Sequence, residues 1–445
     1  MAGMFGTSGI RGIYGTEVAP ELAMRAGNAA AKKGERFIVA RDARATSPVL
    51  SESLSAGAML AGAEVYDIGL APTPLLAYAT WREKCNGAMV TASHNPPEYN
   101  GIKLFCCGME FSRGQEAAVE AALQGKESTA LWSETGQKKG RDYSQEYIHF
   151  LLSQVDTPSI AGSRPRVLVD AGNAAASLLA PALLRAAGCD VVELYCDEPG
   201  KFARSLEPKA GTLSAASEAV KKNKCDLGIA FDGDGDRAIG IDGKGRVLAL
   251  DVQLAIFCRH FLKRKKGAII STVEASLCVK EAVEREGGRL HITPVGSLHV
   301  SEEVKRLGAV FGGEPCGEYV FPSSTPCADG LLAALHLAEI SCTGGGLFAL
   351  ADAVKTYPIE RRKYACAGKS REKIMSGLAK KLSFEGASLS TMDGLRFDFP
   401  DGWLLVRPSG TEPAIRLTCE FRSKKRLDDA VSFAEKGIAA AIGPG

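Results

Sequence analysis

The feature that most constrains the fold of this chain is a repeated alternation of short apolar runs with longer stretches of helical period. The first copy predicts a strand at 36–44, a helix at 48–63 and a second strand at 64–69. Short apolar runs that are each followed by a helix are typical of parallel strands with crossover helices. The chain is therefore expected to build α/β units.

The same plan returns twice, and the tail follows a different one. Two further units of strand, helix and strand are predicted at 166–173, 174–188 and 190–195, and at 267–276, 277–286 and 289–296. The tail has two or three strands around turns at 395–421 and an amphipathic helix at 423–442. We predict three similar α/β domains with mixed sheets and a small α+β C-terminal domain.

The length of the chain supports this division, because 445 residues exceed one ordinary hydrophobic core. Two Pro-containing stretches, at 156–165 and 356–363, are typical of linkers. The predicted domains are 1–155, 156–250, 251–358 and 359–445, and the break near Leu250 has no compositional mark.

Composition narrows the class of function. The 54 basic and 52 acidic residues give a net charge of +2, which predicts no nucleic-acid partner and no membrane. No run approaches the ~18 apolar residues of a membrane span, and the first residues lack an apolar core of signal-peptide length. The 13 cysteines include no Cys-x-x-Cys and lie mostly in apolar contexts, so we expect reduced thiols and a cytoplasmic protein.

The stretch TASHNPPEYNGIK (91–103) follows an apolar run and cannot be helical. Pro96 and Pro97 exclude a helix around them, so Ser93 is expected on a rigid loop just beyond the end of a strand. A tight turn in which Ser93 and Asn95 satisfy local backbone groups is one interpretation. A hydroxyl displayed for chemistry is the other.

A second stretch, DGDGDR (232–237), alternates three aspartates with glycines. Asp232, Asp234 and Asp236 can point to one side of an extended loop, and their mutual repulsion favours a hard divalent cation. An EF-hand is excluded because Arg237 and Gly243 stand where its loop needs Gly and Glu. A solvated acidic turn is the remaining alternative. Magnesium would need a further oxygen ligand, which a phosphorylated Ser93 would supply.

Two further loops carry polar groups between strands. RPSGTEP (407–413) combines Arg407, Ser409, Gly410 and Thr411 with the nearby Arg416, a set that suits a phosphate group. A simple hairpin turn is its alternative. GGEPCGEYVF (312–321) carries Glu314, Cys316 and Glu318 between glycines, and these side chains could reach sugar hydroxyls from a loop. A glycine-rich turn before a strand is the alternative for this stretch.

Taken in order, these stretches resemble the α-D-phosphohexomutase family over nearly the whole chain. The matching segments are the N-terminal FGTSGIRG (5–12), the phosphoserine loop TASHNPPEYNGIK, the metal loop DGDGDR, the sugar loop GEPCGEY and the phosphate loop RPSGTEP. The resemblance implies four domains around a central cleft, each of which contributes one loop. It also implies an intramolecular phosphotransferase, monomeric or homodimeric, that needs Mg²⁺ and a hexose 1,6-bisphosphate and moves phosphate between carbons 1 and 6 of a phosphorylated hexose.

The resemblance also assigns roles residue by residue. Ser93 becomes the phosphate donor and acceptor, and it holds the metal together with the three aspartates of the metal loop. The resemblance places Arg237 in the active site, makes Lys103 a candidate acid or base, and assigns Arg11 to the transferring phosphoryl group. His94 is expected to act by hydrogen bonding or proton transfer.

The substrate loops of the family suggest the sugar. Glu314 would bind ring hydroxyls, while the phosphate loop with Arg416 would hold the phosphate that does not react. Bacterial relatives often carry Ser and His where this chain has Cys316 and Glu318. A carboxylate near carbon 2 favours a protonated amine, so glucosamine phosphate is the predicted substrate, with phosphomannomutase or phosphoglucomutase activity as the alternative. A metal-dependent sugar phosphatase and a non-catalytic sugar-phosphate sensor are more distant alternatives.

Overall fold

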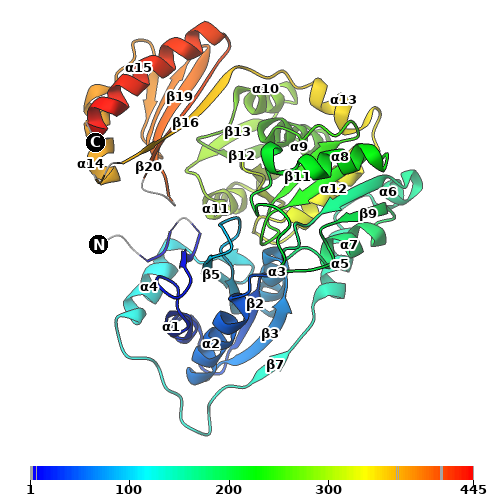
Figure 1. Cartoon of the computed structure of the whole chain (residues 1–445), viewed down its shortest axis with the longest axis vertical. Coiled ribbons are helices and arrows are strands. Elements are labelled where there is room, and N and C mark those ends of the chain that lie inside the picture. The colour runs from blue at the N-terminus through cyan, green and yellow to red at the C-terminus, as the bar shows by residue number, and fades with distance from the viewer. Residues whose placement is uncertain (1–3, 7, 367, 369, 411–413, 444–445) are drawn as a thin grey trace.

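The computed structural model describes the chain except for residues 1–3, 7, 367, 369, 411–413 and 444–445. The described part folds into four sheets, each with its own helices, which we call the first to fourth domains in chain order. Figure 1 shows the first domain below, the second and third packed at the upper right, and the fourth standing apart at the upper left. The predicted class of three mixed α/β domains and a small C-terminal α+β domain is confirmed.

The first domain is built on a mixed sheet in the order β1-β5-β4-β2-β3-β7, with β6 paired to β5. Its strands are β1 (Ile10–Ile13), β2 (Arg36–Arg41), β3 (Glu64–Leu70), β4 (Asn86–Val90), β5 (Tyr99–Cys106), β6 (Met109–Glu110) and β7 (Lys138–Gly140). Its helices are α1 (Pro20–Ala30), α2 (Ser47–Leu60), α3 (Thr73–Glu83), α4 (Arg113–Leu123) and α5 (Ser144–Leu152). The β2–β3 and β2–β4 pairs are parallel, whereas β5 runs antiparallel to both β4 and β1. The chain therefore reverses between β4 and β5, and the Ser93 loop lies at that reversal.

The second and third domains repeat a smaller mixed sheet. The second has the order β11-β10-β8-β9, from α6 (Thr157–Ser163), β8 (Arg166–Asp170), α7 (Leu179–Ala186), β9 (Asp190–Leu194), η1 (Ala210–Thr212), α8 (Ser214–Lys222), β10 (Leu227–Phe231) and β11 (Ala238–Asp242). The third has the order β13-β12-β14-β15, from α9 (Leu250–Arg264), β12 (Ala268–Thr272), α10 (Leu277–Arg285), β13 (Arg289–Thr293), α11 (Ser297–Leu307), β14 (Phe311–Gly313), β15 (Tyr319–Val320), α12 (Gly330–Ser341) and α13 (Gly346–Asp352).

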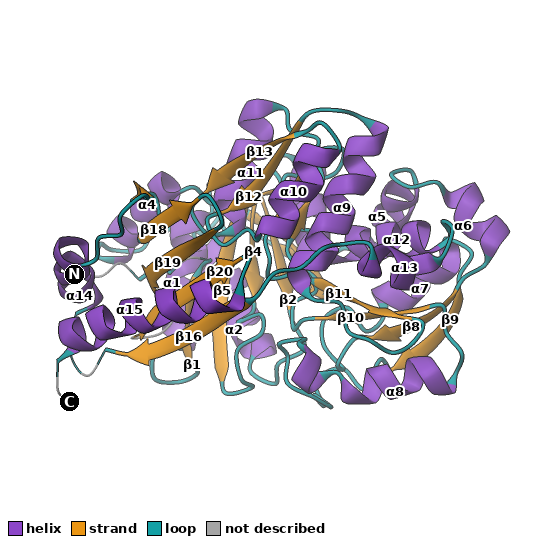
Figure 2. Cartoon of the chain, turned by 90° about the horizontal axis from the view of Figure 1, so that it is seen from above, coloured by secondary structure: helices purple, strands orange, loops and turns teal. Residues whose placement is uncertain are grey.

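The fourth domain is an antiparallel sheet in the order β16-β20-β19-β18-β17. It consists of β16 (Ile359–Ala365), α14 (Arg371–Lys381), β17 (Ser388–Ser390), β18 (Leu395–Phe399), β19 (Gly402–Pro408), β20 (Ala414–Phe421) and α15 (Lys424–Ile442). Both helices cover one face of the sheet, where apolar residues of alternating register pack against them. The opposite face is turned towards the other domains, as the view from above shows (Figure 2).

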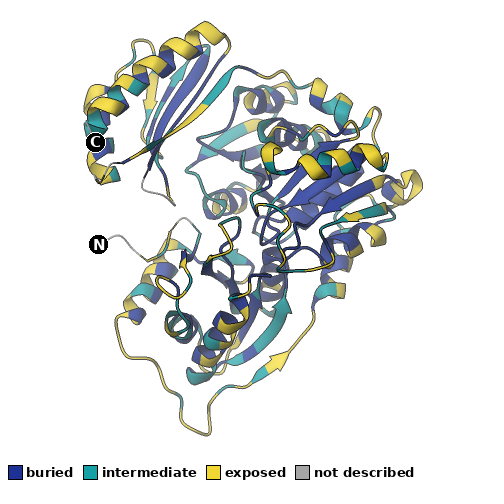
Figure 3. Cartoon of the chain, viewed as in Figure 1, coloured by how far each residue is buried: buried dark blue, intermediate teal, exposed yellow. Residues whose placement is uncertain are grey.

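Burial separates the fourth domain from the rest. One large core cluster runs through the first three domains, whereas the fourth has its own cluster and meets the third through the small apolar contact of Val273, Trp403 and Leu405. Figure 3 shows the buried central helices and the largely exposed outer faces of α14 and α15. In the described residues no single helix meets the length and composition needed to cross a membrane; the bent pair of α12 and α13 does, and α12 lies inside the core.

Local details differ from the sequence-based expectation in three places. The predicted linker at 156–165 contains helix α6, whose first turn is capped by the carboxylate of Asp156 accepting from Ser159 N at 3.1 Å. The helix expected from 174 begins only at Leu179, because Asn173 adopts a left-handed backbone with φ of 55° and the next residues form turns. The second predicted linker, 356–363, already enters strand β16.

Candidate active site

Ser93 lies on the loop that connects β4 to β5, with its hydroxyl directed at the aspartate loop of the second domain. Its backbone is left-handed, with φ of 49°, and the residue is 1% exposed. The hydroxyl donates to Asp232 Oδ2 at 2.9 Å, and His94 Nδ1 lies 3.2 Å from the same oxygen. A left-handed serine costs about 1–3 kcal/mol, so the surrounding structure must hold this loop in place.

Arg44, which the sequence analysis missed, provides that support. Its guanidinium is fully buried and pairs with Asp42 at 3.0 Å. The remaining N–H groups donate to four backbone carbonyls of the serine loop, those of Ser93 (2.7 Å), Asn95 (2.7 Å), Pro96 (2.5 Å) and Tyr99 (3.0 Å). A planar fork with five donors suits this task, which a lysine ammonium cannot perform.

The three aspartates of the metal loop converge between β10 and β11. Each contributes a carboxylate oxygen to a group whose members lie within 4.8 Å of one another. The N–H groups of Gly235 and Arg237 fix Asp232 Oδ1 at 3.0 and 3.2 Å. Asp234 Oδ1 and Asp236 Oδ1 are buried without a hydrogen-bond partner in the described part of the chain. Unpartnered buried carboxylate oxygens are costly unless a cation binds them, so this donor set fits a divalent metal ion.

The serine and aspartate loops touch directly. A Cβ atom on Gly233 would come within 2.2 Å of the Ser93 carbonyl oxygen, so only glycine allows this approach. Thr73, another residue missed by the sequence analysis, donates from Oγ1 to Asp234 Oδ2 at 2.6 Å. Contacts between residues so far apart in the chain leave no local signal in the sequence.

Lys103, on β5, is buried against the same carboxylates. Its Nζ lies 2.9 Å from Asp234 and 3.0 Å from Asp236. Burial opposes its charge, but these two carboxylates raise the pKa of Lys103 well above its usual value. Burial and the neighbouring Asp234 raise the pKa of Asp236 to about 6. Lys103 therefore carries a fixed positive charge at the centre of the site.

Arg237 joins the metal loop to the sugar loop. Its Nε and Nη2 donate to Glu318 Oε1 at 2.9 and 2.6 Å, and the two residues form an isolated antiparallel bridge. The positive charge of Arg237, followed by burial and Arg11, lowers the pKa of His94 to about 2. His94 is therefore neutral beside the serine hydroxyl. Arg11 donates to Asn95 Oδ1 at 3.3 Å and leaves its Nε buried without a hydrogen-bond partner among the described residues.

The sugar loop presents its carboxylates from the edge of the third domain. Glu314 is 3% exposed and accepts from the Gly296 N–H at 3.0 Å. Burial, and then the negative charge of Glu318, raise the pKa of Glu314 well above its usual value. Burial likewise raises the pKa of the Cys316 thiol. The pairing of Glu318 with Arg237 was not foreseen from the sequence.

The phosphate loop carries cations that face one another. Arg407 on β19 lies directly opposite Arg416 on β20, and like charges in such a cross-strand pair are destabilising unless an anion lies between them. Arg407 contacts Asp393 at 3.0 Å and Glu274 at 3.6 Å, while its Nε and the Ser409 hydroxyl are buried without hydrogen-bond partners in the described chain. Thr411, the remaining predicted member, lies outside the described residues.

The predicted residues meet in one cavity of about 210 Å³ between the four domains. Those that line it are Arg11, His94, Arg237, Glu314, Cys316, Glu318, Arg407, Gly410 and Arg416. Ser93, Lys103 and the three aspartates are buried and do not line it, but the Ser93 hydroxyl lies 3.2 Å from His94 Nδ1, and His94 does line it. The cavity thus offers cations and hydrogen-bonding loops above a serine hydroxyl and a metal-binding set, an arrangement suited to phosphoryl transfer.

Comparison with known proteins agrees with this geometry. Models of the phosphoglucomutase/phosphomannomutase family match the chain in four parts: alpha/beta/alpha domain I at 2–130, domain II at 145–245, domain III at 250–357 and the C-terminal domain at 363–435. A probable phosphoglucosamine mutase of Thermococcus gammatolerans is 37% identical over 450 residues, covering 99% of each chain.

Solved structures share the fold. A phosphoglucomutase/phosphomannomutase family protein from Burkholderia thailandensis superimposes with a TM-score of 0.87 at 28% identity, covering 98% of this chain and 97% of that one. Aspergillus fumigatus N-acetylphosphoglucosamine mutase, solved with GlcNAc-6P and magnesium, has a TM-score of 0.63 at 15% identity over 99% and 96% of the two chains. Matches to all four domain models, together with a full-length relative at this identity, show that the chain belongs to the phosphoglucomutase/phosphomannomutase (α-D-phosphohexomutase) family.

Proposed function

We propose that this phosphohexomutase converts glucosamine 6-phosphate to glucosamine 1-phosphate through a phosphorylated Ser93 and a bound 1,6-bisphosphate. The observation that carries the phosphoserine is the Ser93 hydroxyl, held 2.9 Å from Asp232 beside two carboxylate oxygens without partners. The amino sugar is supported by the full-length relatives, which are named probable phosphoglucosamine mutases.

The reaction consists of two phosphoryl transfers at the same serine. In the first, the bond between phosphorus and Ser93 Oγ breaks and the hydroxyl at carbon 1 gains the phosphoryl group, which yields the bisphosphate. After the sugar turns, the phosphate at carbon 6 returns to Ser93, and the 1-phosphate leaves. The proton lost by one hydroxyl in each transfer is regained by the other.

In such a transfer, the transition state is stabilised mainly by fixed positive charge around the reacting oxygens. Arg11 and Arg237 line the cavity, and Lys103 lies below them with its charge stabilised by two aspartates. Asp232, Asp234 and Asp236, with the phosphate on Ser93, would hold Mg²⁺, which would neutralise charge on the phosphoryl oxygens. Neutral His94 holds the serine oxygen in place through its hydrogen bond at 3.2 Å.

The distal phosphate is proposed to bind between Arg407 and Arg416, with Ser409, Gly410 and Thr411 around it. This site is proposed to bind the phosphate group without distinguishing between sugars, so it would accept the bisphosphate in both orientations. Glu314 is proposed to bind two ring hydroxyls. Glu318 shares its charge with Arg237 through Oε1, and its other oxygen is proposed to face the amine at carbon 2.

A coupled isomerase assay with glucosamine, glucose and mannose 6-phosphates tests this proposal, with catalytic 1,6-bisphosphate and Mg²⁺ present. We expect the highest kcat/KM for glucosamine 6-phosphate and loss of activity when EDTA is titrated, with recovery on adding Mg²⁺. A higher efficiency for mannose or glucose phosphate would instead assign a phosphomannomutase or phosphoglucomutase. Release of inorganic phosphate as the main product would indicate a phosphatase, and absence of any turnover would indicate a sensor.

The proposed recognition of the carbon 2 amine by Glu318 is tested with the variant Glu318→Gln. This variant keeps the shape of the side chain but removes its charge, so the preference for glucosamine phosphate over glucose phosphate should fall. An unchanged ranking of the three sugars would show that Glu318 serves only to hold Arg237.

A further inference from the structure

Two histidines and a glutamate form a cluster between two helices of the third domain. His260 lies on α9, while His336 and Glu339 lie three residues apart on α12. Residues at this spacing share one face of a helix, so the imidazole and the carboxylate of α12 both face His260. One nitrogen from each histidine and one carboxylate oxygen lie within 4.8 Å of one another. The cluster lies outside the five segments that resemble the family motifs.

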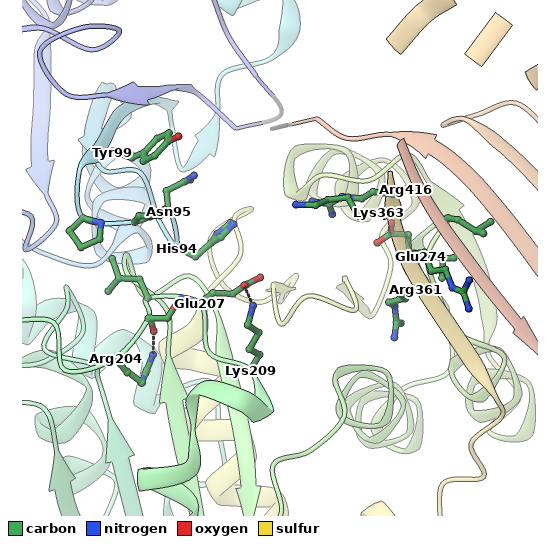
Figure 4. A pocket seen from close by; sticks show the side chains of 17 residues that line it. His94, Asn95, Tyr99, Arg204, Glu207, Lys209, Glu274, Arg361, Lys363 and Arg416 are labelled. Carbon is green, nitrogen blue, oxygen red and sulfur yellow. Dashed lines mark hydrogen bonds and ion pairs between the residues drawn. The ribbon is translucent and has the colours of Figure 1, made fainter. Parts of the chain in front are cut away.

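The cluster is also separate from the catalytic cleft. The cavity of about 860 Å³ in Figure 4 belongs to that cleft, because it shares four lining residues with the catalytic cavity: His94, Glu207, Glu274 and Arg416. His260, His336 and Glu339 line neither cavity. The side chains of His336 and Glu339 are 2% and 5% exposed, and that of His260 is 15% exposed. The cluster is therefore a buried site that solvent reaches beside His260.

The distances within the cluster match those between the ligands of a tetrahedral metal ion. Glu339 Oε2 lies 3.0 Å from His336 Nδ1 and 3.3 Å from His260 Nε2. In a tetrahedral zinc site, bonds of about 2.0–2.2 Å place neighbouring ligand atoms about 3.4 Å apart. Small shifts of the three side chains would therefore bring all three atoms around one ion.

One of the three ligand atoms is buried without a hydrogen-bond partner in the described chain. This atom is His260 Nε2, which is close to Glu339 Oε2 but is not aligned with it for a hydrogen bond. A buried polar atom without a partner is costly. A cation bound to the lone pair of this nitrogen would remove that cost.

The surrounding contacts orient the cluster as the outer contacts of a metal site do. Glu339 Oε1 accepts from the Asp156 N–H at 2.8 Å and from Arg264 at 2.5 Å, which leaves Oε2 facing the imidazoles. The His336 ring packs edge to face on Phe261, with ring centroids 4.9 Å apart. Metal-binding side chains are typically oriented by second contacts of this kind. The charge of Arg264 opposes a cation, but its side chain is 44% exposed, so solvent screens it.

We propose that His260, His336 and Glu339 bind a zinc ion, with a water molecule as the fourth ligand on the exposed side of His260. Imidazole nitrogens suit Zn²⁺, whereas Mg²⁺ prefers oxygen ligands. The ion would join α9 to α12 and, through Asp156, to the start of the second domain. Its effect is on the stability of this junction, and its binding does not depend on the mutase reaction.

Zinc binding is measured on the full-length enzyme after metal ions have been removed with EDTA and dialysis. An excess of Mg²⁺ occupies the aspartate loop, and Zn²⁺ is then titrated in competition with a chromophoric zinc chelator. Co²⁺ is the second probe, because a four-coordinate site with nitrogen ligands absorbs visible light much more strongly than a six-coordinate oxygen site. We expect the wild type to bind one Zn²⁺ at this site and to give the intense Co²⁺ absorption.

His260→Ala should weaken Zn²⁺ binding by more than the roughly 10- to 100-fold that loss of a second-shell partner costs, and it should abolish the intense Co²⁺ absorption. Zn²⁺ should raise the melting temperature of the wild type but not that of this variant. Mutase activity of His260→Ala with Mg²⁺ should equal that of the wild type. His336→Gln, which can still hydrogen-bond to Glu339, should lose the site in the same way. The matched control is His149→Ala, which removes an exposed histidine of α5 and should bind Zn²⁺ like the wild type.

Two results would overturn the zinc site. One is an unchanged Zn²⁺ affinity in both His260→Ala and His336→Gln. The other is a wild-type Co²⁺ spectrum that shows only the weak absorption of a six-coordinate oxygen site. In either case the three side chains would form a hydrogen-bonded network without a metal ion. Absence of turnover in the wild type would instead refute the proposed function, and because the zinc titration needs no turnover, the two failures are distinguishable.

Discussion

At the scale of single residues, the candidate site contains a strained backbone and several buried polar atoms without hydrogen-bond partners in the described chain. Ser93 holds a left-handed backbone. Asp234 Oδ1, Asp236 Oδ1 and the Arg407 Nε are buried without hydrogen-bond partners within the described chain. Such features are costly in a folded protein and concentrate at functional sites. They therefore identify the positions at which substitution should affect activity more than folding.

Ser93→Ala is the first such substitution. It removes the oxygen that would carry the phosphoryl group, so activity should fall to near background, while the melting temperature should stay close to that of the wild type. Intact-mass analysis of the active wild type should find one added phosphate, which peptide mapping places on Ser93, and the alanine variant should lack it. Full activity in the variant, or phosphate on another residue, would contradict the assignment.

Arg407→Ala tests the phosphate loop. A charge-assisted hydrogen bond to phosphate contributes roughly 1.5–3 kcal/mol, so KM should rise about 10- to 150-fold, by a similar factor for every sugar phosphate. Steady-state kinetics with glucosamine, glucose and mannose phosphates measure this. The control is Arg426→Ala, an exposed arginine of the same domain that pairs with Asp401. A change in the relative kcat/KM values of the three sugar phosphates, without a general rise in KM, would show that Arg407 recognises the sugar and not the phosphate.

At the scale of elements, the loop after β4 is positioned by the loop after β2. Arg44 and Asp42 form a buried pair there, and Arg44 donates to four carbonyls of the serine loop. Arg44→Lys keeps the charge but cannot reproduce the fork. We expect kcat to fall more than KM rises, because the serine loses its alignment while the phosphate loop is untouched. We also expect the variant to be less stable by about 1–3 kcal/mol, because buried carbonyls of the serine loop lose their donors.

Kinetics and urea unfolding of Arg44→Lys measure the two effects separately. Arg36→Lys is the matched control, because its guanidinium lies at the other end of β2 and pairs at the surface with Glu83. A lysine variant that is destabilised yet keeps its full kcat would show that the serine loop needs no such support.

Alternating apolar runs predicted the elements that form the sheets, since strands β2, β8 and β12 begin within two residues of the expected positions. Predictions failed where the local signal was ambiguous. The stretch at 156–165 contains two prolines and reads as a linker, yet Pro158 stands in the first turn of α6, where a proline is compatible with a helix.

In the candidate site too, residues with a local sequence signal could be predicted, whereas contacts between distant residues could not. Spacing and glycines led to the prediction of the aspartates, and two prolines after an apolar run led to that of Ser93, because both signals are local. The supporting contacts join residues far apart in the chain: Thr73 with Asp234, and Arg237 with Glu318. Periodicity and motif spacing carry no information on such pairs, since tertiary packing alone decides which loops meet.

At the scale of the whole molecule, the first three domains share one apolar core cluster and the fourth has its own. A continuous apolar cluster joins the first three, while the fourth meets the third through Val273, Trp403 and Leu405 and a few polar contacts. One of these joins Glu420 to Ser276 Oγ at 2.6 Å. The cations that we propose to hold phosphate, Arg407 and Arg416, therefore lie on the domain that shares the least apolar contact with the others, and a small interface of this kind permits relative motion.

Glu339 connects the second domain to the third. It lies on α12, where it accepts from the Asp156 N–H at 2.8 Å, Arg264 at 2.5 Å and His336 Nδ1 at 3.0 Å, with His260 Nε2 at 3.3 Å. Burial alone would raise the pKa of Glu339, but these contacts, led by the two histidines, hold it well below its usual range. The carboxylate thus links the entrance to the second domain with two helices of the third.

In the metal-free protein, the stabilisation from Glu339 should depend on pH in a defined direction. Because its folded-state pKa is depressed, the folded protein binds fewer protons than the unfolded chain below about pH 4.3, so this contribution is fully present above that pH and is lost as the pH falls. Glu339→Gln should therefore lower the free energy of unfolding by about 1–3 kcal/mol at neutral pH, and the difference from wild type should shrink below about pH 4.3. Urea unfolding across this pH range measures it, with Glu198→Gln, which removes an exposed partner of Lys201, expected to change stability by less than about 1 kcal/mol. A difference between wild type and Glu339→Gln that grows as the pH falls would show that the carboxyl is protonated in the folded state, and the network would then be held by neutral hydrogen bonds.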